Sequence, residues 1–550
     1  SDMPIGGPRP LERAIFSRGY YNSGEDPITV DGVTIEPDNP FYWNIRSLND
    51  EKGHYQNNDE MFSSPQALDM ALDLMDTELN YYMYFAARIT TNEDYRRDLA
   101  WTGNSTLYDK FIHETYDPET VDALQEAISF RYGMDNKTFT EKYVDITSEE
   151  RLAAIDEAND FLDTIFDVVE ANDFAKYIDL RIEQSNKEIA DLEEQIDIQE
   201  QAIIDNPSQE ESLNRHIEEL QKQIDMIETS TIPILEYRLQ ENIIPGEDRW
   251  ENQALNEVSA CRSQLAYTTI MTEEEFSRDP WMAEQYGTYT QYVDSVQAEL
   301  DDLNNRLLIA QRCLDTGKPD MKFVPDGARS ITRNFLGYST FIALFAVMLG
   351  GWIIASEYQQ GTIRLLMIRP KTRLKILMSK YLAALLLCFG IFTAGSLINL
   401  IMNGICFGFR DFAYPNVTVS GSVNFFVYYL PRFLACLVPI VFGYSVAFML
   451  SVLVRNAAVS IAVPIFCFIG SVIAMPMLAY RNANYTKWVA WTPIPYVQIN
   501  NFFSENYMID NMVQRGVPLS LPYGIVLMLV LSAICVVVAM HSFKKRDITN

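Results

Sequence analysis

The distribution of apolar residues divides the chain into two parts. Five stretches toward the C-terminus are nearly free of charge, near residues 335–354, 381–406, 425–453, 457–478 and 522–540. Each approaches or exceeds the roughly 20 residues that a helix needs to cross a bilayer. The first 330 residues contain no comparable apolar run. We therefore expect an all-α membrane protein with five visible transmembrane helices in residues 332–550, preceded by a large α-rich domain in residues 1–331.

A heptad pattern is the clearest local signal in the polar part. From Ile178 to Ile203, apolar residues recur at alternating spacings of four and three, interrupted only by Ser185 and Gln199. A break at Asp205–Ser208 precedes the same rhythm from Leu213 to Ile227. Such a seam among Glu, Gln and Lys predicts a coiled-coil hairpin over residues 172–230. Residues 1–170 are expected to form a globular α-rich part, and residues 231–331 the remaining helices.

Charge separates the same two parts. From Thr332 onward the chain carries 16 Lys and Arg against 5 Asp and Glu, whereas the preceding residues carry 27 against 69. So acidic a domain argues against a nucleic-acid partner, because phosphate binding requires clustered basic residues. The acidic surface is explained by solvation alone or by attraction of cationic ligands or peptides. We favour solvation, because net charge by itself rarely identifies a partner.

Basic residues between the spans set the expected orientation. Six lie between the first and second spans, one between the third and fourth, and three after the fifth: Arg364, Arg369, Lys371, Arg373, Lys375 and Lys380, then Arg455, then Lys544, Lys545 and Arg546. All three segments fall on one side, which the positive-inside rule makes cytoplasmic. We expect a multi-pass protein of the cell membrane, with residues 1–331 extracellular and the C-terminus cytoplasmic. An extracellular N-terminal domain requires a route across the bilayer, so we also expect a leading transmembrane helix that this sequence lacks.

Few residues of the chain suggest chemistry. No Gly-x-x-x-x-Gly-Lys-Ser/Thr loop occurs, so this chain has no standard device for binding ATP phosphates. The four histidines have neither metal-ligand spacing nor a nucleophile beside them. We expect no catalytic residue, metal site or cofactor in this chain. Cys261 and Cys313 are the two cysteines of the polar part, and a disulfide between them is permitted if that part is extracellular. Sequence does not establish their proximity, so both states stay open.

Three polar side chains stand out within the apolar stretches. Asn399 and Asn403 lie in the second span and Tyr444 in the third. Polar groups inside a bilayer can line a transport pathway, or they can form hydrogen bonds between helices. We favour the second role because such bonds are common in helix packing. Arg432, near the outer end of the third span, is expected to reach the lipid headgroups or meet an anionic group.

The segment between the first two spans is the most informative stretch. Gly361 permits a turn, Thr362 can cap a short helix, and Pro370 ends it. Ile363, Leu366 and Met367 would form one apolar stripe of this helix, with Arg364 on a different face. Such an amphipathic helix either lies in the headgroups or docks in a partner's groove. The run Glu357-Tyr358-x-x-Gly361-Thr362-x-Arg364-x-Leu366, followed by Arg369-Pro370 and a span, resembles the coupling-helix region of type-two ABC exporter permeases. The segment from Leu235-Glu236-Tyr237-Arg238-Leu239 to Trp250 also resembles part of the large extracellular insertions in permeases of Gram-positive bacteria.

The resemblance implies a family core of six spans, of which the first is missing here. It implies that Glu357, Gly361, Thr362, Arg364, Leu366 and Arg369 couple the chain to an ABC ATPase subunit. ATP and Mg would be bound by that partner. A second permease chain would complete the exporter, and its cargo would be peptides, antimicrobials or lipid-like molecules. The alternative is a non-transporting membrane scaffold or sensor whose coiled coil binds an extracellular partner.

Overall fold

The computed structural model describes residues 26–205, 207–362, 373–479, 481, 486–503, 507–514 and 516–545. These residues form two compact units, one of residues 26–252, called here the N-terminal unit, and one of residues 253–545, called here the membrane unit. The compositional boundary near residue 331 therefore differs from the packing boundary. Helices of residues 253–331 are polar, yet they pack with the spans that follow them.

The N-terminal unit is helical apart from one β-hairpin. Its hairpin pairs Ile28 with Ile35 and turns at Asp31 and Gly32, whose φ angles of 49° and 79° suit a tight two-residue connection. The elements are β1 (Ile28–Val30), β2 (Val33–Ile35), α2 (Tyr42–Asn57), η1 (Asp59–Met61), α3 (Pro65–Ala86), α4 (Arg97–Thr115), α5 (Val121–Tyr132), α6 (Asn136–Phe139), η2 (Thr140–Val144), α7 (Ser148–Ala171), α8 (Phe174–Asp205), η3 (Pro207–Gln209), α9 (Glu210–Met226), η4 (Ile227–Thr231) and α10 (Ile232–Gln240).

Local signals explain several of these helices. Ser64 caps α3 ahead of Pro65, and Thr147 forms a reciprocal capping box with Glu150 at the start of α7. The aromatic-rich core of the unit includes Phe41 and Phe85, both fully buried. The first 170 residues thus contain the packed helices that their sequence predicts.

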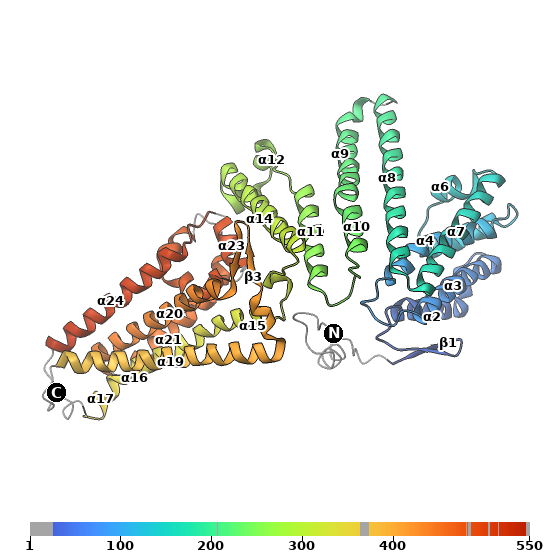
Figure 1. Cartoon of the computed structure of the whole chain (residues 1–550). Coiled ribbons are helices and arrows are strands. Elements are labelled where there is room, and N and C mark those ends of the chain that lie inside the picture. Colours follow the sequence, from blue (N-terminus) through green and yellow to red (C-terminus); the bar gives the residue numbers. More distant parts are fainter. Residues whose placement is uncertain are drawn as a thin grey trace. The chain divides into compact units, whose positions relative to one another are not determined.

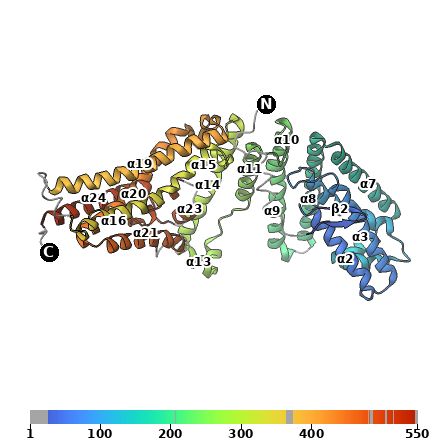
Figure 2. The same cartoon turned by 90° about the horizontal axis from the view of Figure 1, so that it is seen from below.

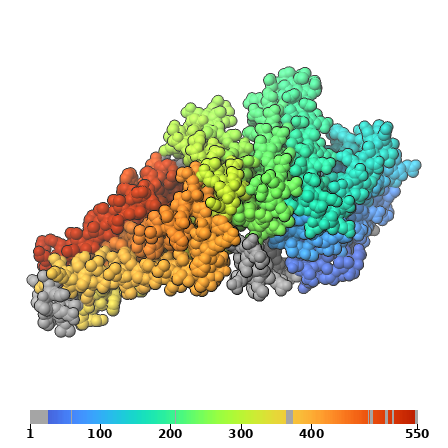
Figure 3. All heavy atoms as spheres, viewed as in Figure 1, coloured from blue at the N-terminus to red at the C-terminus, as the bar shows by residue number. Residues whose placement is uncertain are grey.

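The heptad segment folds as two long helices joined at a break. Helices α8 and α9 lie side by side in Figure 1, and in Figure 3 the atoms of this green part of the chain form one continuous surface. Leu192 packs with Leu220 and Ile227 along the predicted seam. The turn falls at the predicted interruption. The helical hairpin is therefore present, while supercoiling of its two arms stays a prediction.

The membrane unit begins with four helices outside the apolar stretches. They are α11 (Trp250–Tyr267), α12 (Glu273–Arg278), α13 (Pro280–Tyr286) and α14 (Tyr289–Thr316), followed by η5 (Met321–Phe323). Thr272 and Thr288 cap α12 and α14 through their side chains. The apolar face of α14 packs with Phe276 of α12 through Tyr292 and Val296.

Five helices of the described residues are long and apolar enough to cross a membrane. They are Ala328–Gln359, Arg373–Phe407, Phe425–Val454, Ala457–Ala479 and Leu521–Lys545, called here the first to fifth spans. The first comprises α15 (Ala328–Asn334), η6 (Phe335–Tyr338), α16 (Ser339–Ile353) and α17 (Ala355–Gln359); the others are α19, α20, α21 and α24. This confirms the expected all-α membrane architecture. The first two helices start several residues before the apolar stretches because polar turns extend them.

The first and third spans form the centre of the bundle. About half of each is buried, 50% and 56%, against 22% to 28% for the other three. Figure 2 shows α16, α19, α20, α21 and α24 running alongside one another. Close packing depends on glycine: a Cβ atom at Gly350 would lie 2.7 Å from the Tyr444 carbonyl oxygen, and one at Gly351 equally close to that of Ser460.

Short elements connect the spans. They are η7 (Phe409–Ala413), β3 (Pro415–Thr418) and β4 (Gly421–Asn424) before the third span, and η8 (Lys487–Trp491), η9 (Ile494–Tyr496), η10 (Ile499–Phe502) and α23 (Tyr507–Gln514) before the fifth. The β3–β4 ribbon is antiparallel, with Pro415 opposite Asn424. Both connections lie on the side of the bundle from which the first span starts, because consecutive spans alternate in direction.

Candidate functional site

Glu357 links the end of the first span to the start of the second. Its carboxylate Oε1 accepts a hydrogen bond from Lys380 Nζ at 2.6 Å, and its Oε2 accepts one from the Thr362 hydroxyl. Glu357 and Lys380 are each less than a quarter exposed, so solvent screens the pair only partly. Gly361 has a φ of 70°, which a residue with a side chain rarely adopts. One carboxylate thus fixes both ends of the connection between two spans.

The third span also holds this end of the first span. Helix α16 stops at Ile353 and α17 begins at Ala355, and the first backbone N–H groups of a helix have no acceptors within it. The Ser451 hydroxyl of α20 accepts hydrogen bonds from the backbone N–H groups of Ile354 and Ala355, at 3.2 Å and 2.7 Å. The Arg455 guanidinium lies over the Tyr358 ring, 4.6 Å from its centroid. The end of the first span is therefore tied to two neighbours.

Half of the predicted coupling residues belong to this arrangement. Glu357 and Thr362 contact each other, and Gly361 makes the turn between them. Arg364, Leu366 and Arg369 lie outside the described residues, as does the short helix expected after Thr362. The predicted role of Thr362 as a helix cap therefore stays a prediction.

The asparagines of the second span make contacts between helices. Asn403 is 6% exposed, and its amide donates hydrogen bonds of 3.0 Å to the Thr332 hydroxyl of the first span and to Asn399 Oδ1. Tyr444 is fully buried against Tyr381, and its hydroxyl has no hydrogen-bond partner among the described residues. These contacts agree with the favoured packing role of the asparagines, and a pathway role for all three residues stays a prediction.

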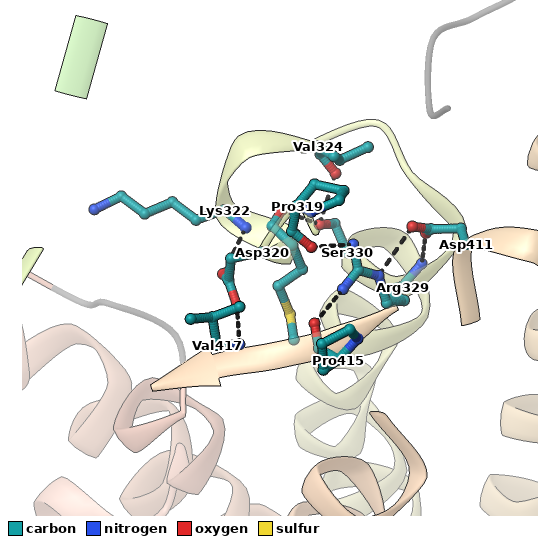
Figure 4. Close-up of polar contacts among 10 residues, drawn as sticks. Pro319, Asp320, Lys322, Val324, Arg329, Ser330, Asp411, Pro415 and Val417 are labelled. Atoms are coloured by element: carbon teal, nitrogen blue, oxygen red, sulfur yellow. Dashed lines mark hydrogen bonds and ion pairs between the residues drawn. The ribbon is translucent and has the colours of Figure 1, made fainter. Parts of the chain in front are cut away.

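A buried ion pair lies at the other end of the first span (Figure 4). Arg329 of α15 and Asp411 of η7 are 0% and 1% exposed, with Arg329 Nε 2.9 Å from Asp411 Oδ1. Asp411 Oδ2 also accepts the backbone N–H of Arg329 at 2.7 Å. The remaining guanidinium nitrogens donate to the carbonyl oxygens of Pro415 and Pro319. Every charge in this cluster is hydrogen-bonded, which is the condition for burying an ion pair.

Asp320 and Glu257 connect the helices outside the apolar stretches to the same region. The Asp320 carboxylate accepts the backbone N–H groups of Lys322 and of Val417 in β3 (Figure 4). Glu257 of α11 accepts hydrogen bonds from Arg306 Nε at 2.8 Å and Lys322 Nζ at 2.7 Å. Burial raises the pKa of Glu257, but these two cations more than offset it and hold that pKa below its ordinary value. Contacts of this kind join α11, α14 and β3 into one framework.

The Cys261–Cys313 disulfide that sequence left open is not formed. Both thiols are free and fully buried. Cys261 lies beside Glu257 and its cations, whereas Cys313 neighbours Asp320 and Arg329, so the two sulfurs belong to different surroundings. Burial raises the pKa of the Cys313 thiol to about 12, which keeps it protonated and unreactive.

The polar framework around Arg329 and Glu257 is absent from the sequence-based predictions. Its partners are far apart in sequence, 82 residues in the case of Arg329 and Asp411. The signal that could have drawn attention to it is a charged residue before the first apolar stretch and one of opposite sign after the second, in segments expected to lie on the same side of the membrane. Among the described residues no group of three or more His, Cys, Asp or Glu could hold a metal ion. The framework fixes the geometry between these helices.

The part of the chain that is similar to a known protein family is mainly the membrane part. The family described as "Protein of unknown function (DUF2705)" matches residues 319–549. The protein "Uncharacterized protein YhcI" of Bacillus subtilis (strain 168) is 27% identical over 246 residues, which cover 43% of this chain and 71% of that protein. No solved structure matches the chain. The chain is thus similar, over its five spans and the residues just before them, to a family whose description assigns no activity.

Proposed function

We propose that the chain is the permease subunit of an ATP-driven exporter of the ABC type. In this proposal a separate subunit binds and hydrolyses ATP with Mg, and this chain performs no bond-breaking chemistry. A second permease chain, identical or different, faces it across the transport route. The cargo would be a peptide, an antimicrobial compound or a lipid-like molecule.

The observation that carries the proposal is the position of Glu357. It binds Thr362 at the start of the connecting segment and Lys380 in the second span, while the backbone next to it is held by Ser451 of the third span. A force applied to that segment by a partner would therefore act on three spans together. An interfacial helix that only rested among headgroups would not require this anchoring. The sequence between these anchors is the part that resembles a coupling helix.

The orientation belongs to the same proposal. One side of the bundle holds three segments rich in Lys and Arg. They are the connection between the first two spans, the connection that contains Arg455 and the end of the fifth span. The positive-inside rule makes that side cytoplasmic, where an ATPase could reach it. Residues 1–331 would then be extracellular, and the α8–α9 hairpin could receive or recognise cargo there.

Co-purification with the ATPase tests the proposal. The double variant Glu357→Ala with Arg364→Ala is expected to lose the ATPase or its stimulation of hydrolysis, because both the anchor and a basic contact residue are removed. Lys545 is a basic residue exposed on the same side, at the end of the fifth span. Lys545→Ala therefore serves as the matched control and should retain both ATPase binding and stimulation of hydrolysis. Thermal unfolding of each variant shows whether the fold persists.

The opposite result has a definite meaning. If the folded double variant binds and stimulates the ATPase as the wild type does, the coupling assignment fails. If no ATPase associates with the wild type while an extracellular protein binds the α8–α9 hairpin, the scaffold or sensor alternative replaces it.

A further inference from the structure

A small cavity with a basic lining lies where the first and third spans begin. Its volume is about 120 Å³, and its lining includes Arg306, Lys322, Arg333, Tyr428 and Phe503. A water molecule occupies about 30 Å³, so a phosphate group can enter such a space. The cavity belongs wholly to the membrane unit and lies on the opposite side of the bundle from Glu357.

Two arginines in or beside this cavity each have one guanidinium nitrogen without an acceptor among the described residues. Arg333 lines the cavity, whereas Arg432 lies beside it, stacked on Tyr428, and donates its Nη1 to the Tyr428 carbonyl oxygen at 2.8 Å. The Nε atoms of Arg333 and Arg432 are both buried and have no acceptor in the part of the chain that the structure describes. Arg329, one helical turn before Arg333, has all of its nitrogens paired, so the difference lies in the surroundings of these two arginines. A buried N–H group without an acceptor is costly, and the cost is larger for a charged group. An anion in the cavity would supply the missing acceptors.

Charge at the cavity also favours an anion. Arg333 lies within electrostatic range of Arg432, so the two like charges repel. Arg432 is stacked over the Tyr428 ring, 3.5 Å from its centroid, which fixes the position of its guanidinium. Three basic side chains line the cavity, those of Arg306, Lys322 and Arg333, against one acidic side chain, that of Asp320. The Asp320 carboxylate already accepts hydrogen bonds from the backbone N–H groups of Lys322 and Val417.

The depth of the two arginines identifies the type of anion. The first span has 32 residues and the third has 30. At 1.5 Å per residue they extend over about 48 Å and 45 Å, against about 30 Å for the hydrocarbon layer. Arg333 and Arg432 lie about 8 Å and 10 Å from the span ends. A bilayer centred on the spans places both within about 3 Å of the boundary between the hydrocarbon layer and the headgroups. From this level their long side chains can reach the lipid phosphates.

We propose that Arg333 and Arg432, assisted by Lys322 and Arg306, bind the phosphate group of an anionic lipid at the surface of the membrane opposite Glu357. Guanidinium groups match phosphate oxygens with paired N–H donors, and the Tyr428 and Phe503 rings cover the side of the site. The acyl chains would continue into the bilayer beside the first and third spans. This site requires only that the chain spans a membrane, and it does not depend on export.

Native mass spectrometry of the full chain in a neutral detergent tests this inference. Phosphatidylglycerol is titrated against diacylglycerol, which lacks the phosphate, and against sodium phosphate at constant ionic strength. We expect one tightly held phosphatidylglycerol, weakened about tenfold or more by Arg333→Gln or Arg432→Gln, because each removes charged hydrogen bonds. Arg333→Lys should retain part of the binding. Arg481 is exposed on the same side of the membrane but does not line the cavity, so Arg481→Gln should change phosphatidylglycerol binding less than twofold.

The remaining outcomes separate the possible sources of phosphate. Displacement of phosphatidylglycerol by millimolar sodium phosphate, with the same dependence on Arg333, would support the phosphate site and identify a soluble ligand. Equal retention of diacylglycerol and phosphatidylglycerol would overturn the inference. So would unchanged phosphatidylglycerol binding in both glutamine variants whose thermal unfolding matches the wild type.

Discussion

Replacing Asp411 by alanine should destabilise the membrane unit strongly. The substitution removes two hydrogen bonds, to Arg329 Nε at 2.9 Å and to the Arg329 backbone N–H at 2.7 Å. It also leaves the fully buried Arg329 charge without its counterion. Breaking a buried pair in this way costs about 3–5 kcal/mol, because the remaining charge is not solvated. Two carbonyl oxygens still contact the guanidinium, so we expect a value of about 3 kcal/mol, near the lower end.

Equilibrium unfolding in mixed detergent micelles can measure this loss as a free energy of unfolding. Asp411→Asn should lose less, because one amide oxygen can still accept a hydrogen bond. A double-mutant cycle with Arg329→Met isolates the coupling between the two side chains. Glu274→Ala in the same unit is the control, because its ion pair with Arg278 is 2.5 Å long but about three-quarters exposed. That control should leave unfolding unchanged.

A small effect would refute the reasoning. If Asp411→Ala costs less than about 1 kcal/mol, the pair behaves like a surface ion pair. Arg329 would then reach solvent or another acceptor once Asp411 is gone, and the framework at the start of the first span would be looser than its burial implies.

Three further predictions concern packing, pH and the thiols. Gly351→Ala should destabilise the bundle by about 1–3 kcal/mol, because its Cβ would lie 2.7 Å from a carbonyl oxygen. Gly390→Ala should not destabilise it, because open space surrounds Gly390, and unfolding of both variants checks the difference. The pKa of Glu257 is lower in the folded chain than in the unfolded one, so its contribution to stability is present at neutral pH and is lost as pH falls below about 4.5. Glu257→Gln should reduce this dependence of stability on pH, which melting curves recorded across that range would measure. Cys261 and Cys313 should both react with an alkylating reagent after denaturation without reductant, and a melting temperature lowered by reductant would contradict this.

The spans were predictable because membrane insertion selects for length and hydropathy, and both are visible in sequence. All five predicted stretches are helices long enough to cross a bilayer. The helical hairpin was predictable for a similar reason, since its spacing of three and four follows helix geometry and its break falls near Pro207. Periodicity could not show which residues of distant segments meet, so the Arg329–Asp411 pair was not foreseen.

The domain boundary shows the same limit of sequence patterns. Composition changes near residue 331 because the solvent changes from water to lipid, but packing changes at residue 252. Helix α14 contacts the connection between the second and third spans through Arg312, which donates to the carbonyl oxygens of Thr418 and Val419. Hydropathy reports what a helix faces on average, and it carries no information about such long-range hydrogen bonds. A polar helix can therefore belong to the membrane unit.

The first span connects the two polar clusters of the membrane unit. Arg329 fixes its start to the framework that holds α11, α14 and β3, and Glu357 fixes its end to the second span. Between them Gly350 and Gly351 bring its backbone against the third and fourth spans, where a Cβ would not fit. Packed helices at such short distances move as rigid pieces, since sliding requires side chains to leave their contacts. A displacement at Glu357 would therefore reach the opposite side of the bundle through the first span and its closely packed neighbours, and Arg329 is the point at which α14 would receive it.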